Sequence, residues 1–249
     1  KQRTTCIKHY IGMYTQMRKC KEKYRNNLSL RWRFRLEWWR HECRKKKKTI
    51  TLSEDEQRQM IHSNCFYCNK ESTNEELGGI DMIIPTLRDY NLYTCVPCCK
   101  QCNYSKGCMK KDEYIQICKN ITAFQNEKIV NDTFIPYRKC YRNEAGTMTS
   151  VYHEYAMSYD RYKYNANTRK LKFEITEDDY ENLRSQGCGY CGLKKKDHIG
   201  LDQMVARGGY IKENLIGACI SCNFVKHTYD KKTFVDKCKD VAITHEKNN

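Results

Sequence analysis

Eight cysteines stand in four Cys-x-x-Cys pairs, a spacing that suits metal binding. The pair in "CFYC" at 65–68 is followed by "PCCKQCN" at 97–103, and the pair in "CGYCG" at 188–192 is followed by "ACISCN" at 218–223. Four thiolates from two such pairs fit the tetrahedral coordination of zinc, whose structural sites are closed. The sequence therefore predicts two structural zinc ions, with the ligands Cys65, Cys68, Cys99, Cys102, Cys188, Cys191, Cys219 and Cys222.

Two other uses of these cysteines fit less well. Disulfide frameworks belong to small secreted proteins, whereas this chain has 249 residues, an odd number of cysteines (17) and no apolar leader at its first residues. A redox pair would need a thioredoxin-like strand and helix, and neither copy shows them. The adjacent Cys98 and Cys99 leave open which thiol binds the first zinc. Cys118 and Cys238 lie at equivalent positions of two amphipathic segments and are expected in the core.

The cysteine pairs belong to two copies of one unit. When Ser53 is aligned with Thr176, the first cysteine pairs coincide, and after a short insertion "GID" at 79–81 matches "GLD" at 200–202. The second cysteine pairs and the segments after them then match without a gap. A register held over this length indicates an internal duplication.

Each copy has the same predicted order of elements. An alternating segment, 49–52 or 172–175, predicts a strand and leads to a capping box, Ser53 with Glu56 or Thr176 with Asp179, which begins a helix. The first cysteine turn, a short hairpin, a helix opened by the second cysteine pair and a closing helix follow. The expected fold is α+β, with two repeated zinc-stapled ββα-type modules, each preceded by a basic helical segment.

The duplication also suggests domain boundaries. The first half, 1–125, would hold a basic aromatic segment, helical over 10–48, and a module at about 49–122. The second half, 126–249, would hold a helical lead-in and a module at about 171–243. In "SLRWRFRLEWWRHECRKKKK" at 29–48, Arg31, Arg33 and Arg35 could contact a phosphate backbone, although the aromatic residues between them more often form the buried face of a helix.

The charge of the chain indicates an anionic partner. Its formal net charge is +16, which favours nucleic acid, DNA above all, with a merely solubilising surface as the plain alternative. No apolar run has the length of a membrane span. We expect a protein of an intracellular, reducing compartment, with the virion and the nucleus as specific options.

The second copy, from "CGYCG" through "IGLDQMVARGGYIKENLIGACISCNFVKHTYDKKTFVDKC", resembles the zinc-bearing branch of the HNH endonuclease family, which is common in phages and large DNA viruses. The first copy shares the resemblance. In that family two strands and a helix hold a catalytic divalent metal, a histidine activates water, and an aspartate helps to hold the metal. The resemblance implies a metal-dependent DNA endonuclease that uses Mg²⁺ or Mn²⁺.

The catalytic residues of the family are incomplete here. The second copy offers Asp202, Asn214 and Asn223, but Gln203 takes the place of the histidine base, and the first copy has Met82 there. Neither side chain can accept a proton at neutral pH, and loss of a general base typically costs about 10²- to 10⁴-fold in rate. Attack by metal-bound water keeps a weak activity open for the second copy. Asp81 and Asp202 could equally be structural.

Two functions follow. The first is a catalytically degenerate HNH-like zinc protein that binds nucleic acid or neighbouring proteins as a structural component of a larger assembly, for example a viral particle. Lys106 and Lys226, after the second cysteine pairs, would then contact nucleic acid. The second is an endonuclease in which the second copy cuts and the first positions the DNA. The missing bases favour the first function.

Overall fold

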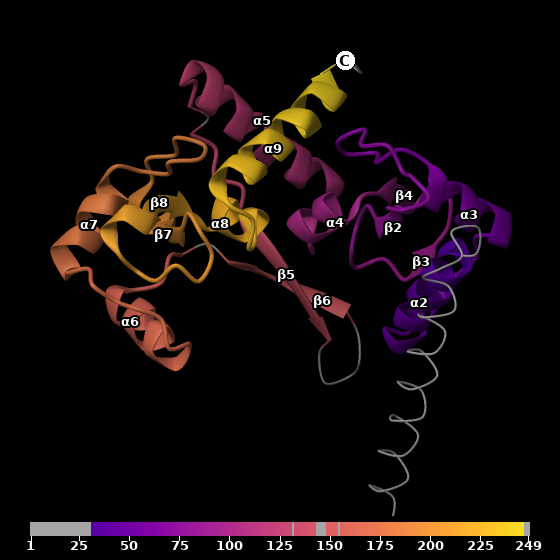
Figure 1. Cartoon of the computed structure of the whole chain (residues 1–249), viewed down its shortest axis with the longest axis horizontal. Coiled ribbons are helices and arrows are strands. Elements are labelled where there is room, and N and C mark those ends of the chain that lie inside the picture. Colours follow the sequence, from indigo (N-terminus) through magenta and orange to yellow (C-terminus); the bar gives the residue numbers. More distant parts are fainter. Residues whose placement is uncertain (1–30, 131, 143–147, 154, 247–249) are drawn as a thin grey trace, which may run out of the picture. The chain divides into compact units, whose positions relative to one another are not determined.

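The computed structural model describes residues 31–130, 132–142, 148–153 and 155–246 (Figure 1). Helices and two-stranded sheets make up these parts, which confirms the α+β class. Packing divides the chain into two compact units. The first holds the elements from α2 to β4, and the second holds α4 and everything after it, together with the short segments Phe66–Asn69 and Ile83–Thr86. Among the described helices, none combines the length and the apolar character that crossing a bilayer requires.

These units differ from the two halves of the sequence repeat. The boundary at 125/126 separates the two copies, whereas packing assigns α4 and α5, the last helices of the first copy, to the second unit. The helix expected over 10–48 lies outside the described residues for its first part. Its later part is α2, Arg31–Lys45.

The first unit is built on α2, β1 (Thr49–Ile50) and α3 (Glu54–His62). The capping box expected at Ser53 and Glu56 is present and begins α3. β2 (Gly79–Met82) pairs antiparallel with β4 (Cys95–Cys98), and β3 (Asp89–Tyr90) pairs parallel with β1. Their core consists of Leu36, Leu52, Met60, Ile61, Ile80 and Cys95.

The second copy repeats these elements. α6 (Tyr159–Thr168) precedes α7 (Glu177–Ser185), which again begins at a capping box. β7 (Ile199–Gln203) pairs antiparallel with β8 (Leu215–Cys219), and short 3-10 turns at Lys196–His198 and Lys212–Asn214 precede the two strands. The registers agree: Asp81 lies opposite Val96 in one hairpin, and Asp202 lies opposite Ile216 in the other. The segment expected as a strand at 172–175 makes a single bridge, Phe173 with Tyr210.

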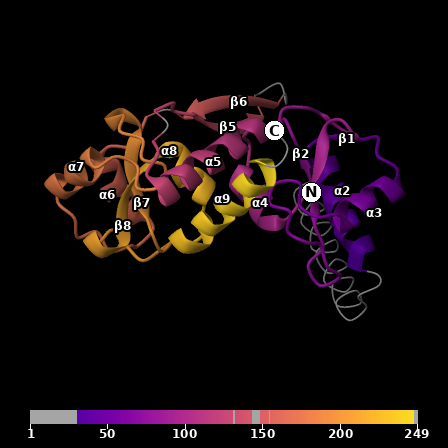
Figure 2. The same ribbon diagram turned by 90° about the horizontal axis from the view of Figure 1, so that it is seen from above.

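Equivalent helices of the two copies pack together in the second unit. α5 (Lys111–Glu127) lies along α9 (Lys231–Glu246), as both views of the ribbon show (Figures 1 and 2). α4 (Lys100–Lys106) packs on α8 (Ile220–Lys226). The Gln125 amide donates to the carbonyls of Gly189 and Tyr190 at 2.9 and 2.8 Å. The equivalent His245 ring of α9 packs on Phe66. Each closing helix therefore also contacts the first cysteine turn of the other copy.

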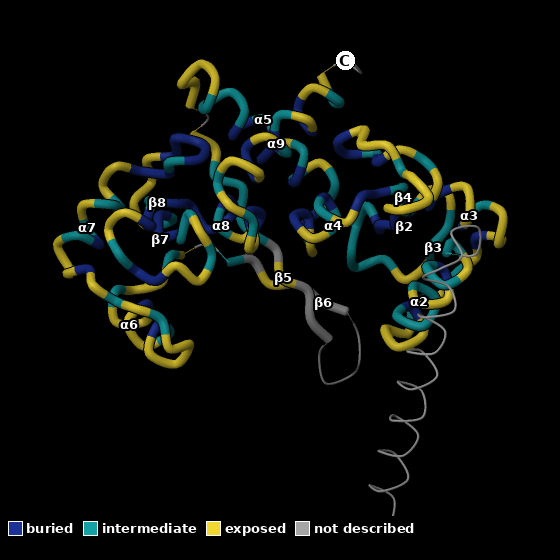
Figure 3. Tube along the Cα trace, in the orientation of Figure 1, coloured by how far each residue is buried: buried dark blue, intermediate teal, exposed yellow. Residues whose placement is uncertain are grey.

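One element was not expected from the sequence. β5 (Tyr137–Arg142) and β6 (Met148–His153) form an antiparallel hairpin between the two copies, with Tyr137 opposite His153. The burial map shows where the interior of the second unit lies (Figure 3). β7 and β8 are almost wholly buried, as are Ile121 of α5 and Val241 of α9.

Candidate metal centres

The second cysteine cluster is assembled from a tight turn and a helix start. After α7 the chain passes through Gly187, whose φ of +81° suits glycine, and a Cβ there would lie 2.7 Å from the Leu193 carbonyl oxygen. The Cys188 amide donates to that carbonyl at 2.8 Å, so the turn closes around the first cysteine pair. Cys219 ends β8, and Cys222 lies in the first turn of α8.

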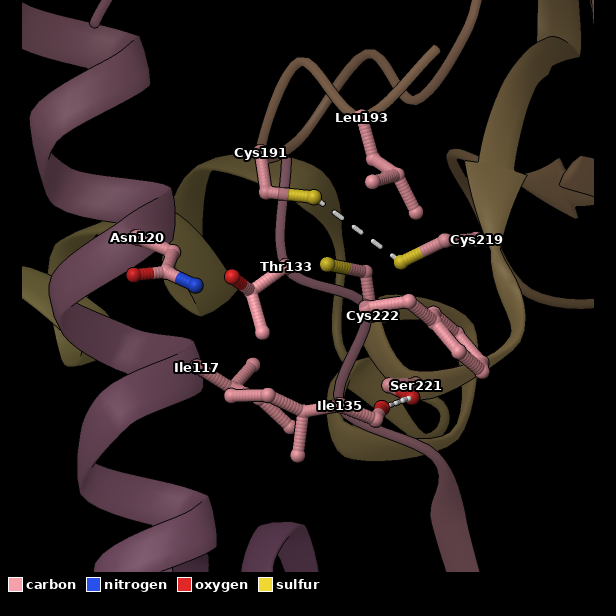
Figure 4. A pocket seen from close by; sticks show the side chains of 10 residues that line it. Ile117, Asn120, Thr133, Ile135, Cys191, Leu193, Cys219, Ser221 and Cys222 are labelled. Atoms are coloured by element: carbon pink, nitrogen blue, oxygen red, sulfur yellow. Dashed lines mark hydrogen bonds between the residues drawn. The ribbon is translucent and has the colours of Figure 1, made fainter. Parts of the chain in front are cut away.

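The four thiols of this cluster are close enough to share one metal ion. Their sulfur atoms all lie within 4.8 Å of one another, and all four residues are buried. The Sγ atoms of Cys191 and Cys219 are 3.8 Å apart (Figure 4). Tetrahedral zinc with Zn–S bonds of about 2.3 Å would separate its ligands by about 3.8 Å. The donor set and its spacing therefore fit zinc, and four thiolates fill the coordination positions of a structural ion.

The first cluster repeats this arrangement. The Cys65 amide donates to the Lys70 carbonyl at 2.9 Å, the counterpart of the bond from Cys188 to Leu193. Asn69 has a φ of +54° where the second copy has a glycine, a left-handed position that asparagine tolerates. The sulfur atoms, again buried and within 4.8 Å of one another, belong to Cys65, Cys68, Cys99 and Cys102. The two clusters could thus hold two metal ions, consistent with zinc.

The structure decides between the adjacent thiols of Cys98 and Cys99. Cys99 belongs to the four-thiol cluster, whereas Cys98 is the last residue of β4 and lies opposite Gly79. The second copy has Ala218 at the position of Cys98, opposite Gly200. The positions of the thiols therefore favour Cys99 over Cys98 as a metal ligand.

A lysine lies beside the first cluster. Lys237 of α9 donates from Nζ to the Cys68 sulfur at 3.4 Å and to Asp240 at 3.1 Å, and its side chain is only 11% exposed. Burial by itself lowers the pKa of this ammonium, but the Cys68 thiolate and Asp240 outweigh burial and raise the pKa above its ordinary value. A partly buried cation here offsets part of the negative charge that four thiolates bring to a divalent ion.

Asp202, the candidate metal-binding carboxylate, lies in a closed polar network. Its Oδ2 accepts a hydrogen bond from the Tyr190 hydroxyl at 2.6 Å and forms an ion pair with Lys226 Nζ at 3.1 Å. Lys226 also donates to the Gln203 carbonyl at 2.9 Å. Burial raises the pKa of Asp202 above its ordinary value, while Lys226 and Tyr190 act in the opposite direction. Asp202 is 5% exposed, and both of its carboxylate oxygens contact these neighbours.

The other candidate catalytic residues, Asn214 and Asn223, form hydrogen bonds with backbone groups. Asn214 accepts from the Val205 amide at 2.9 Å and donates to the carbonyls of Val205 and Gly209, so it braces the loop between β7 and β8. Asn223 donates to the Leu201 carbonyl at 3.0 Å. In these contacts the two amides serve the hairpin and its loop.

Gln203 occupies the position that the HNH resemblance assigns to the general base. Its Oε1 accepts from the Arg207 amide at 2.9 Å. Its Nε2 is buried and has no hydrogen-bond partner among the described residues. The side-chain amide therefore helps to order the start of the loop. Its oxygen can accept a hydrogen bond but is not basic enough to take a proton from a water molecule.

The residues predicted to contact nucleic acid have different surroundings. Lys106 and Lys226 are 0% and 1% exposed, which removes the open approach that a phosphate would need. On α2, Arg31 donates to the Glu75 carbonyl at 3.1 Å and Arg35 to the Gly78 carbonyl at 3.0 Å, so both order the chain before β2. Arg33 is exposed, with its guanidinium 5.2 Å from the centre of the Trp32 ring. Of the five, Arg33 is the side chain most open to an anion.

Two structural features escaped the sequence analysis. The tyrosine inside each first cysteine pair, Tyr67 or Tyr190, is fully buried, and its recurrence in "CFYC" and "CGYC" was a signal that could have been used. Lys237 carried no such signal, because its equivalent in the first copy is Ile117. Only the packing of α9 brings Lys237 to Cys68.

Comparison with known proteins finds similarity to a viral protein. The chain is 30% identical over 202 residues to Uncharacterized protein R423 of Acanthamoeba polyphaga mimivirus. The match covers 80% of this chain but only 35% of that protein, so the chain spans about a third of the length of its relative. No family model and no solved structure matches. The chain is thus similar to part of a longer viral protein whose name states no function.

Proposed function

We propose that this chain is a catalytically silent, HNH-like zinc protein that binds nucleic acid without cutting it. The observation that carries the proposal is the buried network of Asp202, Tyr190 and Lys226 at the position where the HNH resemblance expects an open metal site. Hairpin and helix follow each other in both copies as that resemblance expects. Zinc bound at the two cysteine clusters would supply the stabilisation that a chain with 39% hydrophobic residues needs.

The charge pairing of Asp202 opposes catalytic metal binding. A nuclease metal such as Mg²⁺ binds to ionised carboxylates and keeps several water molecules. Asp202 instead faces the Lys226 ammonium, whose positive charge would repel a second cation. Gln203 at the base position cannot accept a proton. A divalent ion would have to displace a buried ion pair before any water could be activated.

The positive charge of the chain supports a polyanionic partner. The net charge of +16 includes exposed cations such as the run Arg44–Lys47 at the end of α2. Lysines and arginines that neutralise phosphates release counterions, which produces affinity without sequence readout. Nucleic acid, DNA in the first instance, is therefore the partner we propose. A role within a larger assembly would rest on this binding.

The test separates binding from cutting. The full chain, with its zinc content measured, is incubated with supercoiled plasmid and Mg²⁺ or Mn²⁺, and binding to a labelled duplex is titrated at several salt concentrations. We expect no nicking and an affinity that falls linearly with salt on logarithmic axes. Nicking that is lost in Asp202→Asn would support the endonuclease instead. Affinity that does not depend on salt, or no binding, would contradict the proposed function.

A further inference from the structure

Aromatic rings that are exposed or partly exposed gather on α4, α8 and the first strand of the hairpin between the copies. Tyr104 of α4 and Phe224 of α8 occupy equivalent positions in the repeat, two residues after the last cysteine of each cluster. They are 54% and 44% exposed, although both are large side chains. An exposed aromatic residue present at the same place in both copies is unusual for a position that serves only the core.

Further rings extend this surface. Tyr137 of β5 stacks on Phe224 with ring centres 4.0 Å apart and planes at 7°. His227 meets Tyr104 edge to face at 5.7 Å. A Cβ built on Gly107, one turn after Tyr104, would lie 3.3 Å from the Tyr137 hydroxyl. The rings of both helices and of the strand therefore form one surface, which we call the ring surface: Tyr104, Tyr137, Phe224 and His227.

Cations accompany the ring surface. Lys100 is exposed and holds its ammonium 5.9 Å from the centre of the Tyr104 ring. Lys139 is exposed and lies two residues after Tyr137 on β5, so Lys139 and Tyr137 lie on the same face of the hairpin. Both lysines lie where a phosphate backbone could run past the rings.

We infer that the ring surface binds single-stranded nucleic acid, with unpaired bases stacking on Tyr104 and Phe224 and phosphates contacting Lys100 and Lys139. This inference rests on the proposed nucleic-acid binding and names the form of nucleic acid. Flat rings flanked by cations are the combination by which proteins hold single strands irrespective of sequence. A duplex would contact the cations but keeps its base faces stacked inside the helix. Only a single strand can therefore contact both the lysines and the faces of the rings.

The first experiment compares ring variants by fluorescence anisotropy. The full zinc-loaded chain is titrated with a labelled oligothymidylate of about 20 nucleotides and with the matching duplex. We expect Tyr104→Ala and Phe224→Ala each to weaken single-strand binding about fivefold or more, and the double variant to weaken it further. Tyr104→Phe and Phe224→Tyr keep the rings and should bind like the original chain.

A matched control lies elsewhere in the same unit. Tyr164 of α6 is 61% exposed and has the Arg161 guanidinium 5.5 Å from its ring centre, but it lies outside the ring surface. Tyr164→Ala should leave single-strand affinity unchanged. Zinc content and thermal unfolding of every variant are compared with those of the original chain, so that a loss of folding is recognised.

Salt dependence separates the rings from the lysines. Replacing Lys100 and Lys139 by alanine should reduce the slope of log affinity against log salt by about 0.7 for each phosphate that a lysine no longer neutralises. Tyr104→Ala and Phe224→Ala should lower the affinity and leave the slope unchanged. A strand containing 5-iodouracil should also cross-link to the ring surface on irradiation, as mapped by mass spectrometry.

Failure of this inference differs from failure of the proposed function. If the chain binds the duplex, and the double ring variant binds the single strand as well as the original chain does, the ring surface is not the site and nucleic-acid binding stands. If neither probe is bound at any salt concentration, both are overturned.

Discussion

The two cysteine clusters have the same donors but different neighbours. At the first cluster, the partly buried ammonium of Lys237 donates to Cys68. At the second, the equivalent residue of α5 is Ile117, which faces a small pocket beside Cys191 together with Ile135 (Figure 4). One centre is thus next to a cation, and the pocket beside the other is lined by uncharged side chains.

The difference arises from the way the copies pack. Because α5 lies beside the second cluster and α9 contacts Cys68, part of the surroundings of each centre comes from the helix of the other copy. Substitutions in α5 and α9 can therefore change the electrostatics of a metal site without touching its ligands. Ligand spacing and metal environment are set by different parts of the sequence.

The largest effect should come from the ligands themselves. Cys222→Ser should lower the zinc content by one ion and unfold the second copy, because a structural zinc contributes on the order of 10 kcal/mol, comparable with the whole stability of a domain. Zinc analysis and thermal unfolding measured by circular dichroism test this. In the first copy, Cys99→Ser should lose one zinc and Cys98→Ser should keep both. A zinc content lowered by Cys98→Ser would contradict the assignment of the first cluster.

The next largest effect concerns the network of the second copy. Asp202→Ala leaves the buried Lys226 ammonium without its partner, and we expect a loss of about 3–5 kcal/mol in the free energy of unfolding, measured with urea. The double variant Asp202→Leu with Lys226→Met removes both charges and should recover most of that loss. An Asp202→Ala chain as stable as the original would mean that the carboxylate is not held in this network and could serve a metal.

Lys237→Ile would make the two centres alike. Loss of a group hydrogen-bonded to a metal ligand typically costs about tenfold or more in metal affinity, so zinc should leave the first cluster about tenfold faster in the presence of a coloured chelator. The second cluster should be unaffected. Lys232→Ala, on the same helix and 87% exposed, is the matched control. If zinc left the Lys237→Ile chain at the original rate, Lys237 would not affect how the first cluster holds its metal.

The smallest effect compares the two capping boxes. Thr176→Ala and Ser53→Ala should each cost about 1 kcal/mol, because each removes the acceptor for an amide in the first helical turn. In the second copy, Lys212 and then the Thr176 groups lower the pKa of Asp179 to about 2. The contribution of Asp179 to stability is therefore fully present above the ordinary aspartate pKa and is lost as the pH falls toward 2.

Urea unfolding at neutral pH measures both cap variants. An unchanged free energy of unfolding in Ser53→Ala or Thr176→Ala would contradict the stabilising role of the caps.

Local signals predicted much of the fold. Ser53 with Glu56 and Thr176 with Asp179 begin helices because their bonds close within four residues. The cysteine spacing predicted which thiols come together, since a turn and a helix start impose that geometry. The hairpin of β5 and β6 was missed because its two strand segments do not alternate apolar and polar residues, although "NEAG" at 143–146 contains turn-type residues.

The sequence by itself determined the duplication, the cysteine sets and the absence of histidine from positions 82 and 203, because all of these depend on residue type and short-range spacing. Only the tertiary structure decided that Lys226 neutralises Asp202, that Lys237 lies at Cys68, and that Tyr104 and Phe224 share one surface with Tyr137. Each of these contacts joins residues from different elements. Their meeting depends on how helices and strands pack, which residue type and local spacing do not encode.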